Sequence, residues 1–147
     1  ILEGSAILHK VGIKFRIENI IGIPGENLNQ MLKTLDLNIE CKPDYAWVSI
    51  FSPLPNLPIS NYAIKNGFWD GKMENIKETF FEDTILDTMI RKEIVNLQRI
   101  FGFVVSFPFL RKYILQLIRL PNNSIYTWIY RTWKKYCFDR KLYEVNI

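Results

Sequence analysis

The pattern of apolar residues in the first third of the chain predicts a helix, a strand, a second helix and a second strand. Residues 1–10 have the spacing of a helix that ends before Gly12. Residues 13–21 alternate between apolar and charged side chains and then become continuously apolar, which is typical of a strand covered on both faces at its end. A helix is expected at 27–38 and a strand at 45–51. Because one helix joins the two strands, they are expected to lie parallel with a right-handed crossover.

The remainder of the chain predicts helices and no further strand. A proline-rich loop after the second strand leads into a short helix at 61–65. Apolar residues then recur at spacings of three and four, which predicts a long amphipathic helix. Its start is expected at Thr84, because Thr84 and Asp87 resemble a capping box. Pro108 is expected to start another helix, which ends at Pro121.

The last helix is expected to be capped by Asn123 or Ser124. Its apolar positions share one face and are Ile125, Trp128, Ile129, Trp133 and Tyr136. Basic residues are interleaved with its aromatic residues, namely Arg131, Lys134, Lys135, Arg140 and Lys141. Such interleaving suits RNA or a membrane surface. The rings repeat at core spacing, however, which favours a helix that packs its rings on its neighbours and leaves its lysines outside.

Composition limits the classes of function. The chain has 147 residues, 48% of them hydrophobic, which is enough for a real core. The net charge of +4 is too small to indicate a nucleic-acid partner by itself. Cys41 and Cys137 lie far apart without metal-ligand spacing, so they are expected to be structural thiols in a cytoplasmic protein, and no metal ligand is predicted. The chain begins at Ile1 in an apparent helix, so we expect a fragment of a longer protein whose upstream half is its partner.

The turn after the first predicted strand carries the strongest functional signal. The apolar strand runs directly into Gly22-Ile23-Pro24-Gly25-Glu26, and the next helix follows at once. This places the turn at the carboxyl end of a strand, where open and barrel α/β folds bind their ligands. Glycines at the turn allow a ligand to approach the backbone, and the proline stiffens it.

Three features occur together in this part of the chain: the Gly-x-Pro-Gly-Glu turn, the segment Lys42-Pro43-Asp44, and a second strand that ends in Ser52-Pro53-Leu54-Pro55. Together they resemble the radical S-adenosylmethionine superfamily, most closely its cobalamin-binding branch. The resemblance covers residues 1–67 and implies the last strands and helices of a partial (β/α) TIM-like barrel. Residues 68–147 would form an all-helical C-terminal extension. Asn27 replaces the usual threonine after the turn but is still suited to cap the helix.

The resemblance implies a cofactor site on these elements. Gly22, Pro24, Gly25 and Glu26 would lie against the adenosine part of S-adenosylmethionine. Glu26 could instead hold the N–H groups of its own turn. Ser49 and Phe51 would continue the site with backbone groups that face the adenine, although Phe51 is also suited to be a core aromatic residue.

The family's [4Fe–4S] cluster needs a CxxxCxxC loop, which this sequence lacks. The loop, and any cobalamin-binding domain, would have to lie upstream of Ile1. The expected function is therefore that of a parent enzyme that cleaves S-adenosylmethionine and starts radical chemistry on an unknown substrate, with methyl transfer through cobalamin as one form. This chain alone would not be catalytic. The alternative is a non-catalytic interaction module that docks on a membrane surface or a protein partner through its basic and aromatic C-terminal helices.

Overall fold

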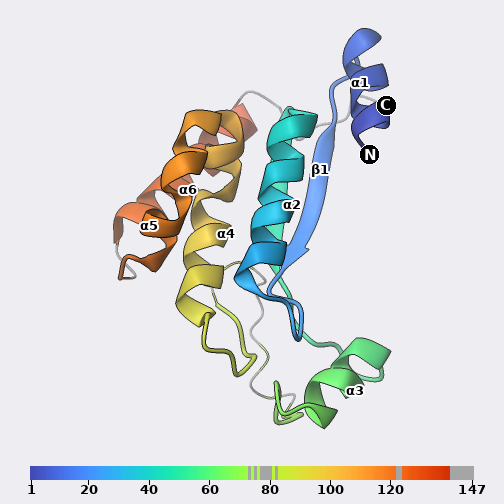
Figure 1. Ribbon diagram of the computed structural model, residues 1–147, viewed down its shortest axis with the longest axis vertical. Coiled ribbons are helices and arrows are strands. Elements are labelled where there is room, and N and C mark those ends of the chain that lie inside the picture. Colours follow the sequence, from blue (N-terminus) through green and yellow to red (C-terminus); the bar gives the residue numbers. More distant parts are fainter. Residues whose placement is uncertain (73, 75, 77–80, 82, 122–123, 140–147) are drawn as a thin grey trace.

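The structure is a computed structural model that describes residues 1–72, 74, 76, 81, 83–121 and 124–139. It is a mixed α/β fold in which helices cover one face of a small sheet (Figure 1). In order along the chain the elements are α1 (Leu2–Lys10), β1 (Arg16–Ile21), α2 (Leu28–Cys41), β2 (Tyr45–Ile50), α3 (Pro58–Lys65), α4 (Arg91–Ser106), the 3₁₀ helix η2 (Pro108–Tyr113), α5 (Ile114–Arg119) and α6 (Ser124–Asp139).

The two strands are parallel and adjacent, as the sequence predicts. Their register pairs Arg16 with Tyr45 and Ile21 with Ile50. Just beyond the strands, the Phe51 N–H donates to the Ile21 carbonyl at 2.8 Å. In the described residues the sheet has these two strands, so the partial barrel is not established by this structure.

The first strand is shorter than predicted, because it begins at Arg16 and not at Ile13. The Ile13 N–H donates to the Leu8 carbonyl at 3.0 Å, so this residue is bonded back to α1 and not to a neighbouring strand. Helix α2, by contrast, begins as predicted. The Asn27 side-chain oxygen accepts a hydrogen bond from the Gln30 N–H, and the Asn27 N–H donates to the Gln30 side-chain oxygen, which completes a capping box.

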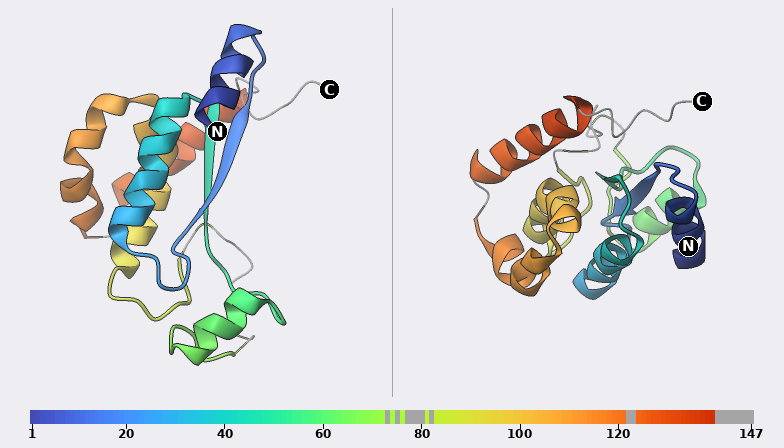
Figure 2. Two further views of the ribbon diagram at one scale, coloured as in Figure 1. Left: turned by 45° about the vertical axis from the view of Figure 1, so that its right-hand side comes forward. Right: turned by 90° about the horizontal axis from the view of Figure 1, so that it is seen from above.

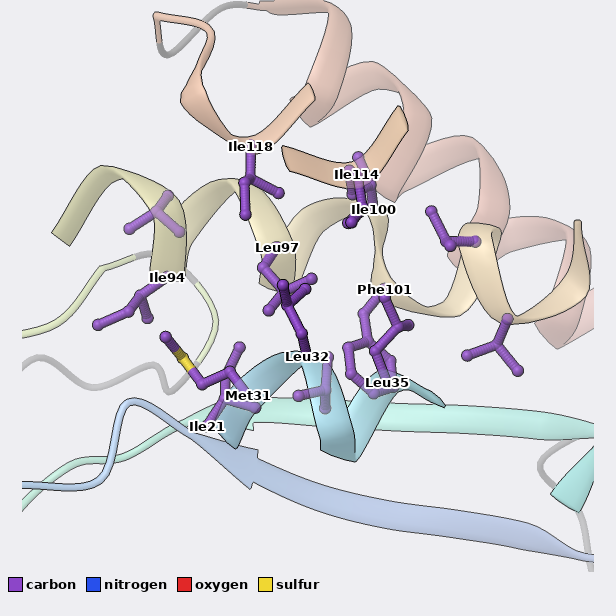
Figure 3. Packing of buried hydrophobic residues seen from close by; sticks show 14 of the residues in the cluster. Ile21, Met31, Leu32, Leu35, Ile94, Leu97, Ile100, Phe101, Ile114 and Ile118 are labelled. Carbon is purple, nitrogen blue, oxygen red and sulfur yellow. The ribbon is translucent and has the colours of Figure 1, made fainter. Parts of the chain in front are cut away.

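Helix α4 lies between the sheet and the last two helices, beside α2 (Figures 1 and 2). Its Leu97 and Phe101 are fully buried, and they point toward Leu32 and Leu35 of α2 (Figure 3). The largest hydrophobic cluster takes residues from both strands and from α2, α4, α5 and α6. One core therefore joins residues on both sides of the boundary expected at residue 67, and the division into 1–67 and 68–147 stays a prediction.

Two helix starts and one helix type differ from the prediction. Helix α4 begins at Arg91, because the Thr84 hydroxyl accepts a hydrogen bond from the Leu86 N–H at 3.1 Å in a local turn and caps no helix. Helix α3 begins at Pro58, three residues early, since proline suits the first turn. Pro108 starts a 3₁₀ helix, which continues as the short α5.

The predicted packing face of α6 is wrong for part of its length. Ile125 is 62% exposed and Trp128 is 65% exposed, whereas Tyr126 and Cys137 are buried. The core-facing side of α6 is therefore rotated from the side that the aromatic spacing indicated. The cap at Asn123 and the basic residues Arg140 and Lys141 lie outside the described residues. Within the described part of the chain, no helix is long and apolar enough to cross a membrane.

Candidate functional site

The turn between β1 and α2 is closed by the carboxylate of Glu26. One oxygen, Oε2, accepts the Gly22 N–H at 2.7 Å and the Ile23 N–H at 3.1 Å. The Glu26 N–H donates back to the Ile23 carbonyl at 2.8 Å. Glu26 therefore holds its own turn, which was one of the two roles expected for it.

Glycine is required at two positions of this turn. Gly22 has φ of 72° and Gly25 has φ of 83°, which is the left-handed region that side chains rarely adopt. A Cβ on Gly22 would also lie 3.1 Å from the Ile94 side chain of α4. Gly22 is therefore needed for packing against α4 as well as for its φ. A Cβ on Gly25 would be 3.5 Å from the Tyr62 hydroxyl, an ordinary contact.

The turn forms one wall of a cavity of about 210 Å³. Gly22, Pro24, Gly25 and Glu26 lie together in this wall, with Ile23 between them. The opposite wall is made of residues that sequence reasoning missed, namely Phe68, Leu86, Thr88 and Ile94. They follow the turn by more than forty residues, and no local motif marks them as its neighbours.

Burial also changes the acidity of Glu26. Desolvation raises the pKa of its carboxyl above the ordinary value, while the N–H groups of Ile23 and Gly22 oppose that change. The carboxylate is therefore held by two donors in a half-buried position. Its known partners are the turn's own backbone, so its first task is to fix the shape of the cavity wall.

Ser49 and Phe51 are not in the lining of this cavity. The Ser49 hydroxyl donates to the Asn19 carbonyl across the sheet at 3.3 Å. The Phe51 N–H is bonded to Ile21, and its ring packs against a small cluster of Ala63, Trp69 and Leu86. The ring of Phe51 therefore packs in the core, which was one of the two roles considered for it. The structure does not bring Ser49 or Phe51 into the cavity at the turn.

The two cysteines have no neighbours among the described residues with which they could form a metal centre. Both are buried and free of disulfides. Burial raises the pKa of the Cys137 thiol to about 11, which keeps it protonated and unreactive. In the residues that the structure describes, no group of three histidine, cysteine, aspartate or glutamate side chains could hold a metal ion.

No family model, curated protein or solved structure matches the chain. The family suggested by the turn motif therefore depends on the motif and on the geometry around it.

Proposed function

We propose that this chain is the later part of the barrel of a radical S-adenosylmethionine enzyme, followed by its helical extension. In this proposal the turn from Gly22 to Glu26 holds the nucleoside part of S-adenosylmethionine. The observation that carries the proposal is the position of the turn. It is a glycine-rich, carboxylate-closed turn at the shared carboxyl edge of two parallel strands, and it faces a cavity.

The size of the cavity supports a partial site. Complete sites for small molecules occupy about 300–1,000 Å³, whereas the cavity at the turn has about 210 Å³. That volume suits one part of a nucleoside ligand and leaves the rest to be bound by other elements. Its walls are apolar at Phe68, Leu86 and Ile94 and offer a hydroxyl at Thr88. A flat base with a polar edge fits such walls.

The outer edge of β1 supports a larger sheet in the intact enzyme. The Ile21 carbonyl points toward β2, so the backbone groups of Ile20, Glu18 and Arg16 point to the opposite edge. Among the described residues, no strand or other backbone group pairs with that edge. The Ile20 side chain is also 54% exposed. An upstream strand of the same barrel would cover both.

The described residues of this chain fit the nucleoside and do not fit the iron–sulfur cluster. No set of three suitable ligands occurs among them, so in this proposal a [4Fe–4S] cluster is held by an upstream segment of the enzyme. When bound together, the two cofactors supply radical chemistry. The residues of this chain would bind and orient the nucleoside and exclude water from it. Cobalamin, if the enzyme uses it, would also be bound by an upstream domain.

The test uses the protein as its gene encodes it, with any chain that precedes Ile1, reconstituted with iron and sulfide. Gly25→Val places a branched side chain at φ of 83° and is expected to weaken S-adenosylmethionine binding at least tenfold in calorimetric titration. The iron content should be unchanged, because the cluster ligands lie elsewhere.

Gly12→Val is the matched control. Gly12 has a similar φ of 72° and no atom within 4 Å of an added Cβ, but it lies before β1 and away from the cavity. It should suffer the same backbone strain and retain binding. Full affinity in Gly25→Val would remove the turn from the cofactor site, and equal losses in both variants would mean that strain alone explains the effect.

A further inference from the structure

A second and larger hollow is lined by residues of α4, the residue after it and α6. Helices α4 and α6 pack side by side (Figure 2). The volume of the hollow is about 600 Å³, within the range of ligand sites. Its lining is mostly aromatic and comprises Phe103, Phe107, Trp128, Ile129, Trp133 and Tyr136, with Ser106 and Thr132 as its hydroxyl groups.

Ring contacts join four of the lining residues, Phe103, Phe107, Trp133 and Tyr136, and extend to Phe109 outside the lining. Phe107 lies 4.8 Å from Phe103, 6.1 Å from Trp133 and 6.3 Å from Phe109 between ring centroids. Trp133 in turn stacks on Tyr136 at 5.3 Å. Some aromatic side chains in and beside the hollow face the solvent. Phe109 and Trp128 are both 65% exposed, although large aromatic side chains are usually buried.

The charge of this region is mostly positive, although Arg111 is paired with Asp36 and Asp139 follows Lys135 by one turn at the end of α6. Between Glu93 and Asp139 the sequence has no aspartate or glutamate, and it has seven cations, which are Arg99, Arg111, Lys112, Arg119, Arg131, Lys134 and Lys135. Arg131 and Lys135 follow Trp128 by three and seven positions, so they share its exposed face of α6. Both cations are exposed beside the aromatic surface.

We propose that this aromatic hollow and its flanking cations dock the protein on an anionic membrane surface. The types of side chain on this surface suit such a membrane. Exposed tryptophan and tyrosine rings suit the boundary between headgroups and acyl chains, and lysine and arginine beside them attract anionic headgroups. A helix with such a face lies in the plane of the interface. The inference does not depend on the S-adenosylmethionine site, which is formed by other residues.

The test is flotation of the full chain with lipid vesicles. Phosphatidylcholine vesicles are compared with vesicles that also contain phosphatidylserine, at low and at high salt. The protein should float with the anionic vesicles, should bind those of phosphatidylcholine alone at least tenfold more weakly, and should be released by salt, because salt screens exposed charges. Equal binding to both vesicle types would overturn the role of the cations.

Two pairs of variants separate the parts of the surface. Arg131→Glu together with Lys135→Glu should reduce the partition onto anionic vesicles by at least about tenfold. Lys33→Glu together with Lys65→Glu makes the same change of charge on the exposed faces of α2 and α3 and should have a small effect. Trp128→Ser should also weaken binding, whereas Met89→Ser, at an exposed position before α4, should not. All six substituted positions are exposed, so the fold should be retained, as checked by circular dichroism.

The following outcomes would contradict membrane docking through this surface. Binding of monomeric oleate with no vesicle binding would make the hollow a pocket for a free acyl chain. Binding of single-stranded RNA, or no binding to any vesicle, would overturn membrane docking altogether. Equal loss of vesicle binding in both charge-reversed variants would show that only the net charge of the protein matters. It would contradict the role of Arg131 and Lys135.

Discussion

The Glu26 carboxylate accepts the N–H of Gly22, four residues earlier, at 2.7 Å. This bond closes the turn within a single five-residue motif, without help from a distant part of the chain. A second bond from the Ile23 N–H to the same oxygen completes it. The position of the turn at the strand end is therefore set locally, while the opposite wall of its cavity comes from residues that pack there in the tertiary structure.

Removing this carboxylate should destabilise the fold. Glu26→Ala leaves the buried Gly22 N–H without its acceptor, so the free energy of unfolding should fall by about 1–3 kcal/mol. Glu26→Gln keeps an acceptor oxygen and should lose less. Urea denaturation of both variants beside the wild type measures the two values. Equal losses would contradict the role assigned to the hydrogen bonds.

The contribution of Glu26 to the free energy of unfolding should increase as the pH falls, which is the opposite of what a carboxylate with a lowered pKa does. Burial raises the pKa of Glu26 above its ordinary value of 4.5, so its charged form is disfavoured in the folded state. Its contribution to stability should therefore be complete below the ordinary pKa and should fall as the pH rises through the raised value. Denaturation of wild type and Glu26→Gln at several pH values should show wild type gaining relative to the variant on acidification. A relative loss on acidification would reverse the sign and contradict this account.

Helix α4 should carry much of the folding energy. Leu97 and Phe101 are 0% exposed and lie in the centre of the largest cluster. Leu97→Ala should cost about 2–5 kcal/mol and Phe101→Ala about 3–5 kcal/mol, through lost burial and the cavity left behind. Met89→Ala, at a fully exposed position, should change stability by less than about 0.5 kcal/mol. Losses below that limit at both core positions would contradict the packing of α4 against the sheet and α2.

Gly102 should be intolerant of a side chain because α4 lies close to β2 there. An added Cβ would be 2.9 Å from the Trp133 ring nitrogen and 3.1 Å from the Ala46 carbonyl. Gly102→Ala should therefore lower the free energy of unfolding by about 1–3 kcal/mol, despite the better helix propensity of alanine. The control is Gly4→Ala in α1, where no atom lies within 4 Å and a gain of about 0.5–1 kcal/mol is expected. Thermal denaturation of the two variants distinguishes crowding from propensity.

The sequence predicts best what is decided by neighbouring residues. The cap at Asn27 and the order of helix, strand, helix and strand depend on local patterns, and the structure has them. The start of α4 was misplaced because Leu86 keeps the helical spacing although it is buried in a separate cluster with Trp69. The hydroxyl of Thr84 closes a turn there instead.

Long-range packing accounts for the other differences. The aromatic spacing of α6 predicted one buried face, but Tyr126 occupies the core and Trp128 lies outside. Which side of α6 faces the core depends on how closely α6 packs against α4. That distance is set at Gly102, which lies against Trp133 although the two residues are far apart in the sequence. For the same reason Thr88 and Ile94 could not be assigned to the candidate site from their own surroundings in the sequence.

The most direct test of the central claim is photolabelling of the full-length protein with an 8-azidoadenosine analogue of S-adenosylmethionine, followed by tryptic mapping. Cleavage after Arg16 and Lys33 releases the whole turn in one peptide, Ile17 to Lys33. The account predicts that this peptide carries label and that unlabelled S-adenosylmethionine prevents the labelling. Label that is competed away only from other peptides, with none on residues 17–33, would contradict the assignment of this turn to the nucleoside.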